Sequence, residues 1–156
     1  MIQNIVVEHC GNDHLGQIYS ICEIPVPGFP KPQNGGLWTS PINSENNWRK
    51  WCKEEDFHVE RLEKSFRLEI DTSHLLIIDS FDDLMQKMVR PKIMEVGLYE
   101  LVCIDWKRLV SMYNGIWLTT RGEAETRFSY PYTLYGWDCE TVFLFNDKPI
   151  IKILDK

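Results

Sequence analysis

The carboxylate of Glu140 stands where a polar, aromatic-rich segment gives way to an apolar run. The residues that follow, 141–145, are rich in β-branched and aromatic types, which predicts a strand. After a turn sequence, residues 150–154 predict the second strand of a hairpin. A carboxylate at the start of a rigid strand can face a cleft and act as an acid, a base or an electrostatic stabiliser. The alternative interpretation is a solvated carboxylate at the edge of a sheet.

Two further strand ends carry side chains or backbone suited to binding. Residues 4–9 form a β-branched run that ends in His9, and Gly11 lets the backbone turn away from it. Residues 36–41 predict a short strand that glycines introduce and a proline ends, with Trp38 inside it. A half-buried histidine with satisfied hydrogen bonds, and a tryptophan in the core, are the structural alternatives.

The rest of the chain alternates strands with amphipathic helices. Further strands are predicted at 66–70, 75–78 and 116–120, and helices at 44–52, after the N-cap Ser80 and after the N-cap Asp105. Two long loops remain, at 11–36 and 121–135. Loops of this length in a compact domain are usually functional. This mixture of elements predicts an α+β fold.

Composition limits the possible partners and compartments. The 156 residues, 44% hydrophobic and 26% charged, suffice for one domain, 1–156, with an apolar core. The 17 basic and 23 acidic residues give a net charge of −6, which argues against nucleic acid and anionic membranes as partners. No apolar run approaches the roughly 20 residues of a membrane helix. We also see no signal-peptide pattern, so we expect a cytoplasmic protein.

The sequence lacks the motifs of several common enzyme classes. There is no glycine-rich phosphate loop, no HExxH and no nucleophile elbow. The five cysteines are scattered without a CxxC pair, which predicts reduced thiols and no metal site. Cys10 beside His9 suggests a thiol nucleophile, but no third group marks the orientation that such a pair needs.

The order of the polar strand ends resembles the ADP-ribosyltransferase fold. In that superfamily three separated strands supply His or Arg, a Tyr or Ser region, and Glu. Here His9-Cys10-Gly11 resembles the first, the segment 36–40 (Gly-Leu-Trp-Thr-Ser) the second, and Glu140 the third. The segment 104–116 also resembles small bacterial members. Trp38 stands where Tyr is frequent in the family, and Asp138 stands where arginine-modifying members carry Glu or Gln.

The resemblance implies a fold, a cofactor and a set of roles. The fold would be two small packed antiparallel or mixed sheets that form a cleft, with about three short helices. The substrate would be NAD⁺, which would be cleaved at the nicotinamide–ribose bond. The ADP-ribose would pass to an acceptor, for which a protein is one candidate. Glu140 would stabilise the oxocarbenium-like transition state. The NAD⁺-binding residues would be His9, Gly11, Gly36, Leu37, Trp38 and Thr39, and the acceptor would dock on Arg127, Tyr132 and Tyr135.

Two other functions remain open on the sequence. One is a non-catalytic interaction or inhibitor protein that uses its aromatic residues and long loops as a binding surface. The other is an RNA-directed relative that acts on a phosphorylated ribose, against which the acidic balance speaks. The feature that separates these functions from the enzyme is whether His9, Trp38 and Glu140 converge on one cleft.

Overall fold

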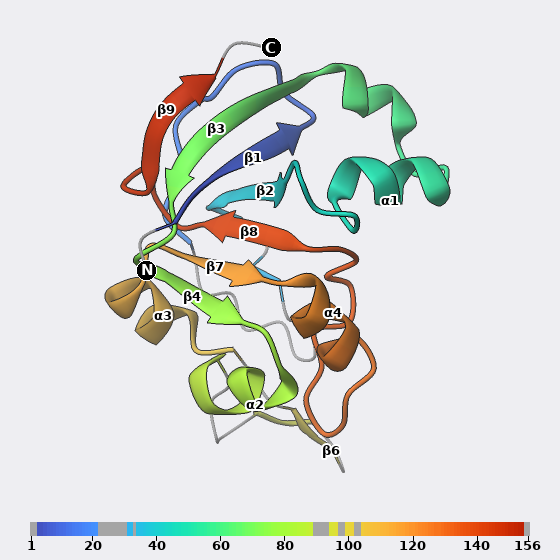
Figure 1. The fold of residues 1–156 in the computed structure, drawn as a ribbon. Coiled ribbons are helices and arrows are strands. Elements are labelled where there is room, and N and C mark those ends of the chain that lie inside the picture. The colour runs from blue at the N-terminus through green and yellow to red at the C-terminus, as the bar shows by residue number, and fades with distance from the viewer. Residues whose placement is uncertain are drawn as a thin grey trace.

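The structure is a computed structural model, and it describes residues 3–21, 31–32, 34–88, 94–96, 99–101 and 104–154 (Figure 1). Among these residues no helix has both the length and the apolar character needed to cross a bilayer. Part of the predicted loop 11–36, namely 22–30 and 33, lies outside the described residues.

Seven strands form one mixed sheet in the order β4-β7-β8-β2-β1-β3-β9. All neighbours are antiparallel except β4 and β7, which are parallel. The strands are β1 (Asn4–Cys10), β2 (Leu37–Pro41), β3 (Ser65–Asp71), β4 (Leu75–Ile78), β7 (Gly115–Leu118), β8 (Thr141–Leu144) and β9 (Ile150–Leu154). A separate two-stranded ribbon joins β5 (Met94–Val96) to β6 (Tyr99–Leu101). The α+β prediction is confirmed.

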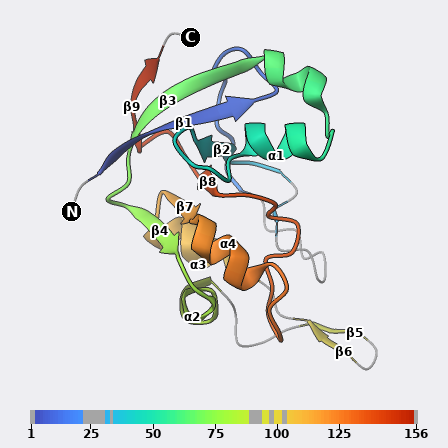
Figure 2. The same ribbon diagram turned by 45° about the vertical axis from the view of Figure 1, so that its right-hand side comes forward.

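The sheet has two halves that meet at β2. In Figures 1 and 2, β1, β3 and β9 form the upper half, and β8, β7 and β4 the lower half. The halves were expected as separate packed sheets, yet β2 hydrogen-bonds to both. Its contact with β1 is short, with the register pairs Val7↔Pro41 and Glu8↔Ser40, whereas β1 and β3 pair along their whole length. Because β1 and β2 pair over so few residues, the two halves of the sheet can have different orientations.

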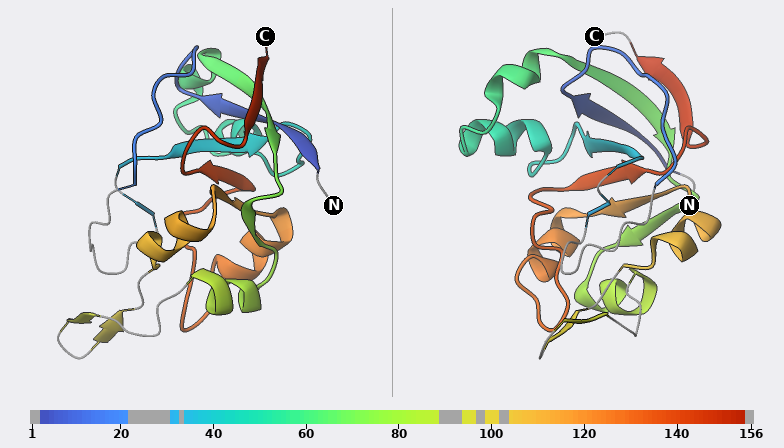
Figure 3. Two further views of the ribbon diagram at one scale, coloured as in Figure 1. Left: turned by 90° about the vertical axis from the view of Figure 1, so that its left-hand side faces the viewer. Right: turned by 180° about the vertical axis from the view of Figure 1, so that it is seen from behind.

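Within the described residues four short α-helices accompany the sheet, and a polar side chain caps each N-terminus. They are α1 (Trp48–Glu54, cap Asn47), α2 (Phe81–Asp83, cap Ser80), α3 (Trp106–Met112, cap Asp105) and α4 (Thr120–Thr126, cap Thr119). A π-helical turn, Leu84–Met88, continues α2, and a 3₁₀ helix, Val59–Glu63, follows α1. Figure 3 shows α2 and α3 against the lower half and α1 beside the upper half.

The helix α4 lies where the sequence predicted the start of a loop. Thr119 and Thr120 were predicted to belong to the strand 116–120, and glycine, as at position 122, is a poor helix former. In the structure the strand ends at Leu118, and the Thr119 hydroxyl accepts a hydrogen bond from the Gly122 N–H at 3.0 Å. The cap and the close packing of Gly122 therefore outweigh the local propensity.

The core consists of two clusters on opposite faces of the sheet. The first lies between the lower half and α2 and α3, and includes Leu84, Leu109 and Phe143. The second takes Val7 and Leu68 from the upper half, and Val142 and Leu144 from the lower half. Because the second cluster contains side chains from both halves, the two halves of the open sheet share one apolar interior.

We predict that Gly122→Ala destabilises the protein, although alanine is the better helix former. A Cβ at this position would lie 2.1 Å from the Ile78 carbonyl oxygen. The helix must therefore move away from β4, at an expected cost of about 1–3 kcal/mol. Urea unfolding measures this cost. Ala124→Gly in the same helix reports propensity alone and serves as the control. Unchanged or increased stability of Gly122→Ala would contradict the close packing.

Candidate functional site

A cavity of about 670 Å³ opens where β1, β2, α1 and the segment before β8 meet. Small-molecule sites commonly have volumes of this order. Three indole rings and two carboxylates stand in its wall. The lining residues are Glu8, His9, Cys10, Lys31, Pro32, Trp38, Thr39, Trp48, Trp137, Asp138 and Thr141.

The three strands singled out in the sequence are consecutive neighbours, in the order β8-β2-β1. Thr39 pairs with Val142 across β2 and β8, and Glu8 pairs with Ser40 across β1 and β2. More than a hundred residues separate the first strand from the last, so this adjacency is a long-range property of the fold. The prediction that these strands are neighbours is confirmed.

His9 is held at the cavity by hydrogen bonds on both ring nitrogens. Its Nδ1 lies 2.7 Å from the Trp38 carbonyl oxygen, and its Nε2 lies 3.2 Å from the Asn12 side-chain nitrogen. A carbonyl oxygen only accepts, so Nδ1 carries the proton and Nε2 accepts from the Asn12 amide. The ring also packs 5.1 Å from that of Phe66. This arrangement fixes the imidazole ring between β1 and β2.

Trp38 belongs both to the cavity wall and to the core. Its ring stacks on Phe143 at 4.1 Å and meets the edge of Trp137 at 4.9 Å. The Lys31 ammonium lies over the same indole, 5.5 Å from the ring centre. Phe143 covers one face of the indole, which leaves the other face for the cavity.

Glu140 differs from His9 and Trp38, because its carboxylate is hydrogen-bonded to other segments and does not line the cavity. Its carboxylate accepts hydrogen bonds from Ser44 Oγ at 2.6 Å, Thr120 Oγ1 at 2.7 Å and Trp117 Nε1 at 2.8 Å. The residue is 9% exposed. Its neighbour Thr141 lines the cavity, and successive side chains of an extended segment point to opposite sides. Glu140 is not one of the described residues that line the cavity, and its catalytic role stays a prediction.

Asp138 is the acid of this segment that faces the cavity, and the sequence analysis gave it no role there. Its carboxylate lies 3.4 Å from Arg127 Nη2, and its carbonyl oxygen accepts from Arg127 Nη1 at 3.3 Å. Arg127 also pairs with Glu123 at 3.1 Å, and that hydrogen bond raises the pKa of the guanidinium. Arg127, predicted to bind an acceptor, therefore anchors Asp138 in this structure.

Of the other predicted NAD⁺-binding residues, Thr39 lines the cavity, and Gly11, Gly36 and Leu37 are not among its described lining residues. A Cβ on Gly36 would meet the Phe143 ring at 2.3 Å, and Leu37 packs against the second cluster. Gly11 has φ +115° and donates to the Lys64 carbonyl at 2.7 Å.

The two tyrosines expected to dock an acceptor differ in exposure. Tyr132 packs against the first cluster, and Tyr135 is 62% exposed.

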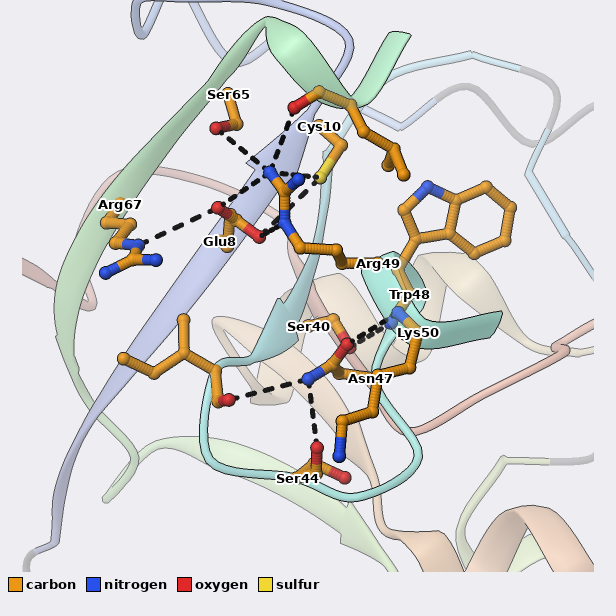
Figure 4. Close-up of polar contacts among 12 residues, drawn as sticks. Glu8, Cys10, Ser40, Ser44, Asn47, Trp48, Arg49, Lys50, Ser65 and Arg67 are labelled. Carbon is orange, nitrogen blue, oxygen red and sulfur yellow. Dashed lines mark hydrogen bonds and ion pairs between the residues drawn. The ribbon is translucent and has the colours of Figure 1, made fainter. Parts of the chain in front are cut away.

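Glu8, at the wall between β1 and α1, was missed by the sequence analysis. Its carboxylate accepts from Arg49 Nε at 2.9 Å and from Arg49 Nη2 at 3.1 Å, a bidentate ion pair, with Arg67 at 3.7 Å (Figure 4). Arg49 also donates to the Leu62 carbonyl at 2.9 Å. The only sequence signal was a carboxylate on the strand that ends in His9, with no indication of its partner.

Two pKa shifts describe the electrostatics of this wall. Burial acts to raise the pKa of Glu8, but the hydrogen bond and charge of Arg49, with Arg67, outweigh it and hold that pKa below its ordinary value of 4.5. Burial and the neighbouring Glu8 charge raise the pKa of Cys10 to about 12. The thiolate is therefore unavailable near neutral pH, which argues against the His9–Cys10 nucleophile.

Comparisons with protein-family models, with curated proteins and with solved structures find no match to this chain. In the part of the chain that the structure describes, no cluster of three or more His, Cys, Asp or Glu residues is arranged to hold a metal ion. The candidate site therefore rests on the geometry of the cavity alone.

We predict that Glu140→Gln lowers the free energy of unfolding by about 1–3 kcal/mol, because charge-assisted hydrogen bonds are lost and an amide N–H₂ faces other donors. Urea unfolding is the measurement, and Glu55→Gln, at the exposed end of α1, is the control. A solvated strand-end carboxylate would leave stability unchanged, so equal stability of the two variants would contradict the buried bonding.

We further predict that Glu8 contributes to acid sensitivity. Its folded-state pKa lies below the unfolded value, so its contribution to stability is complete above about pH 4.5 and is lost as the pH falls through the folded-state pKa. Glu8→Gln should therefore be less stable than wild type by about 1–3 kcal/mol at neutral pH, with the difference narrowing below pH 4.5. Urea unfolding as a function of pH gives both curves. A difference that stays constant at low pH would exclude this role.

Proposed function

We propose that this chain binds NAD⁺ in the cavity, cleaves the nicotinamide–ribose bond and transfers ADP-ribose, with an ADP-ribosyltransferase-like fold. The observation that carries the proposal is the adjacency of β8, β2 and β1, which brings His9, Trp38 and the segment 137–141 to one cavity. The family resemblance predicted these strands as neighbours with Glu140 at the cleft, whereas the residues of this segment that line the cavity are Trp137, Asp138 and Thr141.

The cavity wall suits a flat cationic ring. Nicotinamide in NAD⁺ is a pyridinium, and indole is the best aromatic face for a cation. Trp38 has one face toward the cavity, where a lysine ammonium already lies, so the position attracts positive charge. Trp48 and Trp137 supply further apolar wall. Glu8 and Asp138 also stand in this wall, each paired with an arginine.

The cleavage needs an ionised carboxylate beside the ribose. Departure of nicotinamide builds an oxocarbenium-like centre, and a fixed negative charge stabilises it. The resemblance gives this role to Glu140. The described geometry favours Asp138, because Asp138 lines the cavity while the oxygens of Glu140 are bonded to Ser44, Thr120 and Trp117. In this mechanism Glu140 holds the segment and Asp138 opposes the developing charge.

A second candidate is a binding protein without turnover. Phe128, Tyr130 and Tyr135 are 79%, 90% and 62% exposed, on the segment that leads into Asp138. Aromatic side chains this exposed are suited to a protein interface. A protein that binds a partner here, with or without NAD⁺, would release no nicotinamide.

We predict that NAD⁺ raises the melting temperature, since a ligand at about 100 times its Kd adds about 2.7 kcal/mol to the stability of the native state. Nicotinamide release should fall about 10²–10³-fold in Asp138→Asn while NAD⁺ affinity changes little, because the opposed charge is largest in the transition state. Glu140→Gln should lower the stability of the protein, while the molecules that remain folded should release nicotinamide at the wild-type rate.

Asp147→Asn, in the exposed turn between β8 and β9, is the matched control and should behave as wild type. Reversed behaviour, with turnover lost in Glu140→Gln and kept in Asp138→Asn, would return the catalytic role to Glu140. Wild type that neither binds NAD⁺ nor releases nicotinamide would overturn the proposed function in favour of the binding protein.

A further inference from the structure

Lys31 occupies an unusual position for a lysine. Its side chain lines the cavity, and its ammonium lies 5.5 Å from the centre of the Trp38 indole. Burial lowers its pKa, with the charge of Asp138 acting in the opposite direction. Within the described part of the chain, the ammonium contacts the ring of Trp38 and forms no ion pair with a carboxylate.

The other cations near the cavity are already engaged. Arg49 is bound by Glu8, by the Leu62 carbonyl and by Ser65. Arg127 is bound by Glu123 and by Asp138. Among the described residues that line the cavity, Lys31 is the one with a Lys or Arg side chain. Its ammonium lies against an aromatic face instead of an anion.

The proposed ligand contains an anionic diphosphate beside its cationic ring. The nearby arginines, Arg49 and Arg127, are already paired with Glu8 and Asp138, so binding of the diphosphate needs another cation that can reach into the cavity. A lysine on a flexible stem suits this task, because its ammonium can exchange one partner for another.

We propose that Lys31 binds the diphosphate of the ligand, and that in doing so it yields the face of Trp38 to the cationic ring. Since Phe143 covers the other face of the indole, ammonium and pyridinium compete for the same surface. A ligand that carries both charges resolves the competition, because it pairs the ammonium with phosphate while its ring takes the indole. This inference rests on the proposed function and identifies the residue that selects phosphorylated ligands.

The test compares Lys31→Met and Lys31→Arg with wild type by titration calorimetry against NAD⁺, ADP-ribose and nicotinamide riboside. ADP-ribose has the diphosphate without the cationic ring, and nicotinamide riboside has the ring without phosphate. Lys31→Met should bind ADP-ribose about 10–100-fold more weakly, the range of a charge-assisted hydrogen bond. Its affinity for nicotinamide riboside should be unchanged or higher, and Lys31→Arg should restore most of the ADP-ribose affinity.

Lys148→Met, in the exposed turn before β9, is the control and should bind all three ligands as wild type does. Unchanged ADP-ribose affinity in Lys31→Met, or equal weakening for all three ligands, would overturn the role of Lys31 while leaving the proposed function in place. Wild type that binds none of the three would overturn the proposed function itself, and the inference with it.

Discussion

Every polar atom of Glu140 is hydrogen-bonded, and the arrangement of the site depends on this. Its backbone N–H donates to the Asn46 carbonyl at 2.8 Å, and its carbonyl oxygen accepts from Ser40 Oγ at 2.6 Å. Its carboxylate reaches β7 and the start of α4 through Trp117 and Thr120. One residue thus joins the β2–α1 connection to the lower half of the sheet.

This bonding fixes the direction of the neighbouring side chains. With the Glu140 backbone held between Asn46 and Ser40, Thr141 faces the cavity and Asp138 approaches it from the preceding turn. Ser40 also accepts from the Trp48 N–H at 3.0 Å, so the same hydroxyl helps to place the first residue of α1 in the wall. Hydrogen bonds of Ser40 and Glu140 therefore hold the cavity wall together. They supplement the sheet at the place where β1 and β2 pair over only a few residues.

Local patterns in the sequence predicted much of the fold. The alternation of 66–70 and the apolar run of 75–78 are both strands, and Ser80 and Asp105 are both N-caps, because each signal acts within a few residues. The adjacency of β1, β2 and β8 was predicted from matched strand ends.

The side-chain contacts between distant segments were beyond prediction. The side to which Glu140 points depends on Ser44, Thr120 and Trp117, which lie up to 96 residues away in the chain. Likewise, nothing local distinguishes Lys31 in a proline-rich loop from a solvated lysine, because its position is defined by Trp38 and the cavity.

The one parallel pair of strands divides the chain into a part that builds the cavity and a part that does not. Parallel neighbours need a long crossover connection, and here it runs from the end of β4 to the start of β7 and carries α2, β5, β6 and α3. No described residue of the cavity wall comes from it, since all of them lie within 8–48 or 137–141. The described residues of the crossover therefore act on the pocket only through the core: Leu84 and Leu109 pack in one cluster with Phe143, and the Phe143 ring supports the Trp38 indole of the wall from behind.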